Sequence, residues 1–532
     1  MNTFLVQHYF EKSLSRYNKK ICVRDKEIEL SFEDVNIFSN KLALCLKRNG
    51  AGRQSPIVVS VKRNSYYIGI ILGILKNDSI YIPIDKNCPE NKVVKILNDC
   101  NPPVIICDST TIKKMRDITA KQFHKIILLS IDKEEKTGDI ERNTIISMPE
   151  INSEIDTTAV FRNIDTDLAY ILYTSGSSGN PKGVGITHLN IINYIEWAVK
   201  QFSICDSDRI ISTAPFQFDM FTFDIFTSLK SAATLCIAGD VELMFPIKLL
   251  DFIEKNKGTI WKGISSLFIY IANTKSLEKG RIPTLKKILF GGEELSSKYL
   301  IEWMQKFPDI DFYNVYGPTE ATGISTFYHV PTIPNSSQEK IPIGQACANT
   351  ETYVITEDGD HAKVNEIGEL WIRGSSLSPG YISEEDNLNS VFAKNPFSLV
   401  QSDRIYKTGD LVKTDEKGRL IFIGRKDDQV KVMGYRIELE EIRRAITSIE
   451  GIEDGAVIVY NSPDKDEIKE IIAFYQTLSD LSLEYIITEI KKKIPPYMIP
   501  KHIIRIESIC RTDRMKIDKN ELLKYYIREQ KK

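Results

Sequence analysis

Short apolar runs alternate with amphipathic stretches through the first half of the chain. The run at 56–61 is typical of a buried strand, and the stretch at 65–78 is typical of a helix. A strand at 79–85, a helix at 90–100 and a strand at 103–108 follow. Similar strands are expected at 209–215, 232–239, 258–264 and 286–291. Strand–helix–strand alternation at this spacing predicts parallel sheets with crossover helices.

The pattern changes in the last third of the chain. Short apolar runs broken by Gly and Asp between 340 and 425 predict smaller antiparallel β structure, whereas 130–165 is expected to be an irregular surface connection. After residue 425, helices are expected at 438–450 and 482–493, and strands at 455–460 and 470–475. We therefore predict an α/β protein. Its large N-terminal domain (1–426) has parallel sheets flanked by helices and a small β subdomain, and its mobile C-terminal α+β domain is small (427–532).

Composition narrows the class of protein. A single core rarely grows beyond about 300 residues, so the 532-residue chain should form more than one domain. Its 70 basic and 72 acidic residues give no basic surplus of the kind that a nucleic-acid binder shows. The nine cysteines form no CxxC pair, which favours a reducing compartment over disulfides or zinc. With no long apolar run, we expect a cytoplasmic protein without a nucleic-acid or membrane partner.

The stretch YTSGSSGNPKG, at 173–183, is the first candidate for chemistry. It combines glycines, hydroxyl side chains and the single cation Lys182 directly after an apolar run. Glycines let backbone N–H groups turn toward one point, and hydroxyls add donors, as a polyphosphate requires. The Walker pattern is absent, because Lys182 precedes Gly183 rather than Ser or Thr. Taken alone, the stretch fits a phosphate loop or a surface turn equally well.

Further motifs follow in a fixed order along nearly the whole chain. They are YIPID (81–85), NVYGPTEAT (314–322), GELWIRG (368–374), SPGYI (378–382), YKTGDL (406–411), GRKDDQVKVMGYRIELEEI (424–442) and PPYMIP…RTDRMKID (495–518). Together with the glycine-rich stretch, they resemble the adenylate-forming ANL superfamily, which includes acyl-CoA synthetases, luciferases and adenylation domains of non-ribosomal peptide synthetases. The resemblance implies ATP-dependent activation of a carboxylate with Mg²⁺, release of pyrophosphate and transfer of the acyl group to a thiol.

The resemblance also implies roles for individual residues. It places Thr319 on the α-phosphate, Glu320 on Mg²⁺ and Lys516 on the reacting carboxylate, and it makes Asp427 the hinge between two poses of the C-terminal domain. Arg514-Met515 stands where the family usually has Asn-Gly. The remaining implied nucleotide ligands are Thr174, Ser175, Gly176, Ser177, Ser178, Gly179 and Lys182 on the phosphates, Asn314 and Tyr316 at the base, and Asp410, Phe422 and Arg425 at the ribose.

The segment FQFDMFTFDIF, at 216–226, resembles the substrate helix of amino-acid-activating members. Asp219 would pair with the substrate α-ammonium, and the alternative is a helix-capping Asp. Apart from Asp219 and Lys516, the implied pocket carries no charge, which favours an apolar amino acid such as proline or a branched-chain residue. The remaining pocket positions are Met220, Phe223, Gly263, Leu289, Gly291, Val315, Gly323 and Ile324.

Several alternatives stay open. No carrier segment follows Lys516, so the thiol is expected on a separate phosphopantetheinyl carrier protein. An acyl- or aryl-CoA ligase would have no use for Asp219, and a D-alanine–carrier protein ligase should have a smaller pocket. A non-catalytic nucleotide-binding protein on the same fold is the alternative from another class, but Glu320, Asp410 and Lys516 are all present.

Overall fold

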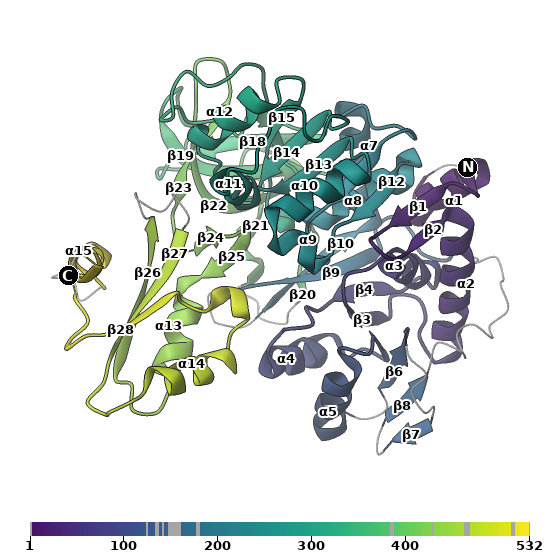
Figure 1. Ribbon diagram of the computed structural model, residues 1–532, viewed down its shortest axis with the longest axis horizontal. Coiled ribbons are helices and arrows are strands. Elements are labelled where there is room, and N and C mark those ends of the chain that lie inside the picture. The colour runs from purple at the N-terminus through teal and green to yellow at the C-terminus, as the bar shows by residue number, and fades with distance from the viewer. Residues whose placement is uncertain are drawn as a thin grey trace. The chain divides into compact units, whose positions relative to one another are not determined.

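The computed structural model describes residues 3–123, 126–132, 138–140, 143–146, 161–176, 181–382, 388–427, 429–461, 469–511 and 517–530 (Figure 1). The chain divides into two compact units. Unit 1 comprises Met1–Lys86, Leu97–Tyr173 and Gly183–Lys426, and unit 2 comprises Asn87–Ile96, Thr174–Lys182 and Asp427–Lys532.

Two nine-stranded sheets form most of unit 1. The first has the order β17 (Gln345–Ala346), β16 (Thr326–Val330), β15 (Asp311–Tyr316), β14 (Lys287–Gly291), β13 (Ile260–Ile264), β11 (Arg209–Ser212), β12 (Thr234–Ile237), β1 (Ile21–Arg24), β2 (Glu29–Ser31). The second has the order β20 (Gly380–Ile382), β10 (Lys182–Thr187), β9 (Leu168–Thr174), β4 (Ile80–Pro83), β3 (Pro56–Ser60), β5 (Val104–Cys107), β6 (Ile127–Ser130), β8 (Asn143–Ile146), β7 (Gly138–Ile140).

The central strands of both sheets are parallel, as the alternation of apolar runs predicts. In the first sheet β12, β11, β13, β14 and β15 pair in parallel, and in the second β4, β3, β5, β6 and β8 do. One expectation is wrong: within the predicted irregular connection at 130–165, β8 continues the second sheet beside β6. The strands β7 and β8 are only three and four residues long, too short for a recognisable pattern.

Helices join the strands and cover the sheets. They are α1 (Gln7–Tyr17), α2 (Phe32–Arg48), α3 (Tyr66–Lys76), α4 (Glu90–Cys100), α5 (Ile112–Gln122), α7 (His188–Gln201), α8 (Met220–Ser231), α9 (Asp240–Met244), α10 (Pro246–Lys255), α11 (Ser265–Asn273) and α12 (Ser297–Lys306). Within the described part of the chain, none of the helices is long and apolar enough to cross a bilayer.

The two faces of the first sheet carry different apolar clusters. Trp261, Ile288 and Phe290 pack with residues of α10, α11 and α12. Ile210 and Leu289 point the opposite way and pack with residues of α7 and α8. Because side chains alternate along a strand, each strand position is assigned to one face. We call the second of these faces, the one covered by α7 and α8, the α8 face.

Antiparallel strands form the small β part of unit 1, as predicted. They are β18 (Thr350–Ile355), β19 (Ile367–Gly374), β21 (Phe392–Lys394), β22 (Arg404–Thr414) and β23 (Leu420–Arg425). An apolar cluster joins this part to the end of β15, because Tyr316 packs with residues of β18, β19, β22 and β23. The buried part of this sheet therefore lies where the first sheet ends.

Unit 2 contains the C-terminal α+β structure. Its elements are β24 (Gln429–Val432), β25 (Tyr435–Glu438), α13 (Leu439–Thr447), β26 (Asp454–Asn461), β27 (Lys469–Gln476), α14 (Leu483–Lys491), β28 (His502–Arg505) and α15 (Lys519–Gln530). The strands β26, β27 and β28 form one sheet. Residues of α13 and α14 pack on one face of this sheet, and residues of α15 pack on the other (Figure 1).

Candidate functional site

Glu320 lies in a tightly constrained turn that follows β15. A Cβ on Gly317 would lie 1.8 Å from the carbonyl oxygen of Gly323, so the backbone approach requires glycine. The Glu320 side chain is fully buried, and the hydroxyl of Tyr381 on β20 donates a hydrogen bond to its Oε1 at 2.6 Å. A buried carboxylate needs such donors or a cation. Hard cations such as Mg²⁺ prefer carboxylate oxygens, so the donor chemistry of Glu320 fits the predicted metal ligand.

Asp410 is held between two donors. The hydroxyl of Tyr316 donates to its Oδ2 at 2.5 Å, and the guanidinium of Arg425 donates to its Oδ1 at 2.5 Å. Burial and the Asp410 carboxylate both raise the pKa of Tyr316, so its hydroxyl stays protonated and keeps donating. Phe422 packs against the same apolar cluster as the Tyr316 ring. The structure thus brings together four of the predicted nucleotide residues, Tyr316, Asp410, Phe422 and Arg425.

Asn314, predicted at the base, is also held in place. Its side-chain amide donates to the carbonyl oxygen of Pro342 at 2.8 Å, and its side chain is buried. The neighbouring strands pin its backbone, since β15 pairs with β14 and β16 on either side. Both the side chain and the backbone of Asn314 are therefore held by contacts within unit 1.

Asp219 contacts the turn that contains Thr319 and Glu320 rather than capping a helix. It directly precedes α8, but its side chain makes no capping hydrogen bond to the helix. Instead the hydroxyl of Thr319, one hundred residues away in the sequence, donates to Asp219 Oδ2 at 3.1 Å. The residue predicted to bind the α-ammonium and the residue predicted to bind the α-phosphate are therefore hydrogen-bonded neighbours.

Most of the predicted pocket residues share the α8 face. Phe223, Leu289, Val315 and Ile324 are buried in one apolar cluster, and Met220 packs against it.

Two of the predicted glycines are required by close contacts on this face. A Cβ on Gly291 would lie 2.2 Å from the Val315 carbonyl oxygen, so no side chain fits there. Gly323 has a φ of +89°, and a Cβ there would lie 3.0 Å from the Tyr194 ring.

Gly263 is the exception among the pocket positions. A Cβ at Gly263 would approach the side chains of Phe268 and Trp261, which belong to the cluster on the opposite face. The preceding residue, Lys262, alternates to the α8 face, where its ammonium donates to the carbonyl oxygen of Met220 at 3.3 Å. Strand β13 therefore presents a cation, not a glycine, toward α8.

The structure describes part of the predicted phosphate loop but not the predicted catalytic lysine. Thr174, Ser175, Gly176 and Lys182 fall in unit 2, where the Ser175 hydroxyl donates to the carbonyl oxygen of Arg436 at 2.6 Å. Ser177, Ser178, Gly179 and Lys516 lie outside the described residues. Asp427 begins the last segment of unit 2, and the backbone N–H of Gln429 donates to its Oδ1 at 3.3 Å. The binding of one nucleotide by all these residues and the role of Asp427 as a hinge stay predictions.

The sequence analysis missed four polar residues of the α8 face. Lys262 and Asp224 are buried, as is the side chain of Tyr194, and Arg63 reaches this face from the chain after β3. One signal was available: TIWKGI places a lysine inside an apolar strand, where the ammonium must be buried. Asp224 and Tyr194 lie in helices whose buried sides cannot be assigned from the sequence alone.

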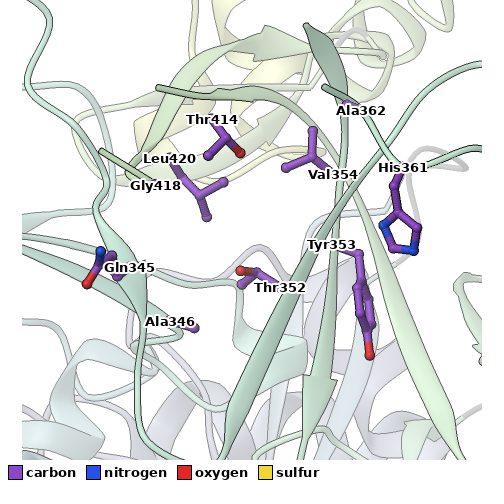
Figure 2. Close-up of a pocket in the computed structure, with 10 residues that line it drawn as sticks. All are labelled: Gln345, Ala346, Thr352, Tyr353, Val354, His361, Ala362, Thr414, Gly418 and Leu420. Atoms are coloured by element: carbon purple, nitrogen blue, oxygen red, sulfur yellow. The ribbon is translucent and has the colours of Figure 1, made fainter. Parts of the chain in front are cut away.

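A cavity of about 300 Å³ lies elsewhere in unit 1. It opens between β17, β18 and the chain around β22 and β23, and Figure 2 shows the side chains of Tyr353 and His361 on its wall. None of the site residues predicted from the sequence lines this cavity. We therefore do not assign the cavity to the candidate site.

Comparisons with known proteins identify one family. The profile of the AMP-binding enzyme family matches residues 10–382. Zwittermicin A synthase ZmaJ of Bacillus cereus is 32% identical over 97% of this chain and 94% of its own length. Gramicidin S synthase 2 of Brevibacillus brevis is 30% identical over 97% of this chain, which spans only 11% of that protein.

A solved structure shares the fold. It is NpsA-ThdA, an artificially fused adenylation–PCP di-domain of a non-ribosomal peptide synthetase from Klebsiella oxytoca. The two chains superpose with a TM-score of 0.78 at 21% identity, and 94% of each chain is covered. The match extends the fold assignment over both predicted parts of the chain, the large N-terminal part and the small C-terminal part.

Proposed function

The chain belongs to the AMP-binding enzyme family of adenylate-forming ligases, and from that premise we propose that it activates an amino acid as an aminoacyl-adenylate and then transfers it to a thiol. The second half of this proposal places the thiol on the phosphopantetheine arm of a separate carrier protein. Amino-acid activation and carrier loading are the two reactions that the experiments below separate.

The contact between Thr319 and Asp219 carries the proposal. A buried or half-buried carboxylate next to a nucleotide site repels the anionic phosphates unless a cation lies between them. The α-ammonium of an amino acid is such a cation, and it lies one carbon from the carboxylate that must reach the α-phosphate. Because Thr319 donates to Asp219 at 3.1 Å, a ligand at Asp219 is within reach of the phosphate turn. A fatty or aryl acid would leave Asp219 without this partner.

The chemistry of the first step is positioning and charge neutralisation. A carboxylate oxygen of the substrate forms a bond to the α-phosphorus while the bond to the bridging oxygen breaks, and pyrophosphate leaves with that electron pair. Asp219 would hold the α-ammonium, and Thr319 would donate to the α-phosphate. Lys516 would stabilise the charge that develops on the reacting oxygens.

The nucleotide side chains have complementary tasks. Tyr316 presents a ring for the adenine, and its hydroxyl is already used by Asp410, which in turn can accept from the ribose hydroxyls. Glu320 would hold Mg²⁺, which when bound neutralises charge on the phosphate oxygens. In the second step the thiolate sulfur attacks the acyl carbon, and AMP leaves with the bridging oxygen.

The side chain of the amino acid is less constrained by the site. The apolar walls formed by Phe223, Leu289, Val315 and Ile324 support the apolar amino acid predicted from the sequence, proline or a branched-chain residue among them. The buried ammonium of Lys262 on the same face opposes a wholly apolar side chain. A cytoplasmic location and a carrier protein supplied in trans stay predictions.

Asp219→Ala is the direct test of amino-acid activation. Amino-acid-dependent ATP–pyrophosphate exchange should fall about 100- to 1,000-fold, because removal of one partner of a buried charge pair costs several kcal/mol. ATP binding, measured by calorimetry, should stay within about twofold of wild type because the phosphate ligands remain. The matched control is Asp251→Ala, which removes an exposed aspartate of the same unit that is paired with Arg281. Full exchange by Asp219→Ala would contradict ammonium pairing.

Carrier loading needs its own measurement. We expect the wild-type enzyme to form an aminoacyl thioester with a holo carrier protein and not with free coenzyme A at the same concentration. Efficient transfer to coenzyme A would place the enzyme with the CoA ligases, even if amino-acid exchange is present.

A further inference from the structure

Charged side chains gather beneath the first turn of α8, on the face of the first sheet that carries most of the predicted amino-acid pocket. Lys262 comes from β13 and is 3% exposed, and Asp224 comes from α8 and is fully buried. Arg63, which follows β3, donates to the backbone carbonyl oxygens of Ser212 and Ala214. Charged groups from β13, from α8 and from the segment after β3 thus lie in one region of the α8 face.

Lys262 has few partners for a buried cation. Its ammonium donates to the carbonyl oxygen of Met220 at 3.3 Å and lies 5.2 Å from the centroid of the Phe223 ring. Within the described residues, no carboxylate forms an ion pair with it. A lysine ammonium carries more N–H donors than one carbonyl oxygen can use, and an unpaired buried charge is costly. The site around Lys262 is therefore incomplete without an acceptor.

Asp224 does not complete it. Both of its carboxylate oxygens are buried and have no hydrogen-bond partner among the described residues. Burial raises the pKa of Asp224 to about 7, and Lys262, Ser212 and Arg63 offset only part of this shift. Asp224 is thus close enough to Lys262 for an electrostatic interaction but makes no ion pair with it.

The charged groups around Lys262 indicate which kind of ligand group would pair with it. Lys262 faces the carboxyl groups of Asp219 and Asp224, and Arg63 faces those of Asp224 and Asp240. Asp240 pairs with Lys86, and burial keeps Asp224 partly protonated near pH 7, so neither neutralises Lys262. The α-ammonium of an amino acid adds another cation beside Asp219, while the α-carboxylate reacts at the nucleotide. A second carboxylate, on the substrate side chain, would give Lys262 a counter-ion, whereas an apolar side chain would leave Lys262 buried without one.

A second buried donor lies near this face. The hydroxyl of Tyr194 is buried and has no hydrogen-bond partner in the described part of the chain. It would lie 3.2 Å from a Cβ on Gly323, which is a predicted pocket position. Polar groups buried in this way are normally paired, so an unpartnered hydroxyl beside a substrate position is ready to bind a ligand oxygen.

We propose that Lys262 binds a carboxylate on the side chain of the substrate, so that the enzyme activates an acidic amino acid. The inference rests on the proposed function, because it takes amino-acid activation as given and names the class of side chain. The apolar walls of the pocket contact the methylene groups of such a side chain, and Lys262 binds its end. This replaces the apolar substrate predicted from the sequence, which counted Gly263 rather than Lys262 as the pocket residue on β13.

Isosteric amino acids provide the test. We measure ATP–pyrophosphate exchange with aspartate, asparagine and leucine, and with glutamate, glutamine and methionine. For wild type we expect the acidic member of one series to exceed its amide by about 30-fold or more in kcat/KM, because a charge-assisted hydrogen bond is stronger than a neutral one. For Lys262→Met we expect the acidic substrate to lose about 100-fold, while the apolar member of the series gains or stays unchanged.

Two further variants keep the result interpretable. Lys262→Arg should retain the preference for the acidic substrate, and Lys287→Met, which changes a half-buried lysine on the neighbouring strand β14, should change nothing. A wild-type preference for an apolar amino acid overturns the inference and leaves the proposed function intact, and it does so even if Lys262→Met fails to fold. Equal losses for all substrates in a folded Lys262→Met variant also overturn it. Silence with every amino acid instead overturns the proposed function.

Discussion

We call the surroundings of Glu320 and Asp410, the predicted nucleotide ligands, the nucleotide region. This region and the α8 face of unit 1 contain similar buried polar side chains, but they differ in how these side chains are paired. Asp410 accepts from Tyr316 and Arg425, and Glu320 accepts from Tyr381. On the α8 face, by contrast, neither carboxylate oxygen of Asp224 has a hydrogen-bond partner among the described residues, and the Tyr194 hydroxyl has none either. The polar side chains around Asp410 and Glu320 thus have partners within the protein, whereas Asp224 and Tyr194 on the α8 face do not among the described residues.

Under the proposed function, this difference separates the binding of the nucleotide from the choice of the amino-acid side chain. Groups that stabilise a nucleotide work best when they are already oriented, because the protein then pays no reorganisation energy during the reaction. Groups that select a side chain can remain unpaired until the correct substrate satisfies them, since a wrong substrate then leaves them buried and unpaired. The polar groups of the α8 face are unpaired in this way, whereas those around Asp410 are already oriented.

Replacement of Lys516 tests whether the paired region needs a further cation. Lys516→Ala should lower amino-acid-dependent ATP–pyrophosphate exchange by about 1,000-fold, because a preorganised charge at the reacting oxygens is lost. Transfer from preformed aminoacyl-adenylate to the carrier thiol should stay within about threefold of wild type. The matched control is Lys524→Ala, an exposed lysine of α15 that pairs with Glu521. Equal losses in both half-reactions would contradict a separate role for Lys516 in adenylation.

Asp224→Asn tests the unpaired region through its pH dependence. The pKa of Asp224 rises from 3.8 to about 7 on folding, so the folded protein holds this proton between these pH values while the unfolded chain has lost it. The contribution of this group to stability is thus present below pH 4 and is lost as the pH rises through 7. It amounts to about 4 kcal/mol over this window.

The difference between wild type and Asp224→Asn isolates this contribution. Lys262, Arg63 and Ser212 surround Asp224 in both proteins, so their effects cancel in the comparison. From pH 4 to pH 8 the free energy of unfolding of wild type, measured with urea, should fall relative to that of the variant. A constant difference across this range would show that Asp224 stays charged and paired in solution.

Asp410→Asn perturbs the paired region and should have the smallest effect of the three. ATP affinity should fall about 10- to 100-fold, because Arg425 loses a charge-assisted hydrogen bond and the ribose loses an acceptor. The ranking of amino acids in the exchange assay should not change, since Asp410 lies outside the α8 face. Asp415→Asn serves as the control, because Asp415 also pairs with an arginine, Arg419, but in a turn after β22. A changed amino-acid ranking in Asp410→Asn would break the separation between the two regions.

The sequence predicts the strands well because they depend on local patterns, and the nucleotide residues stay predictions that rest on local motifs. Continuous apolar runs identify β3, β4 and β5, and the motif around Glu320 is read directly from adjacent residues. The contact between Thr319 and Asp219 joins residues one hundred positions apart, and the resemblance alone implied that they share a site.

The residue of β13 that faces α8 is harder to predict from the sequence, for a physical reason. Adjacent residues in a strand point to opposite faces, so an uncertainty of one position on β13 exchanges Gly263 for Lys262. That single exchange places a buried cation, rather than a glycine, on the α8 face. The partners of Asp224 depend on the packing of α8 against β11 and β13, which no local pattern specifies.

The most direct measurement is ATP–pyrophosphate exchange by the wild-type enzyme with each proteinogenic amino acid, D-alanine, benzoate and a fatty acid. We expect exchange that depends on an amino acid and is strongest with an acidic side chain. Exchange with benzoate or the fatty acid only, or none with any amino acid, would contradict the assignment of Asp219 to an α-ammonium and with it the proposed function.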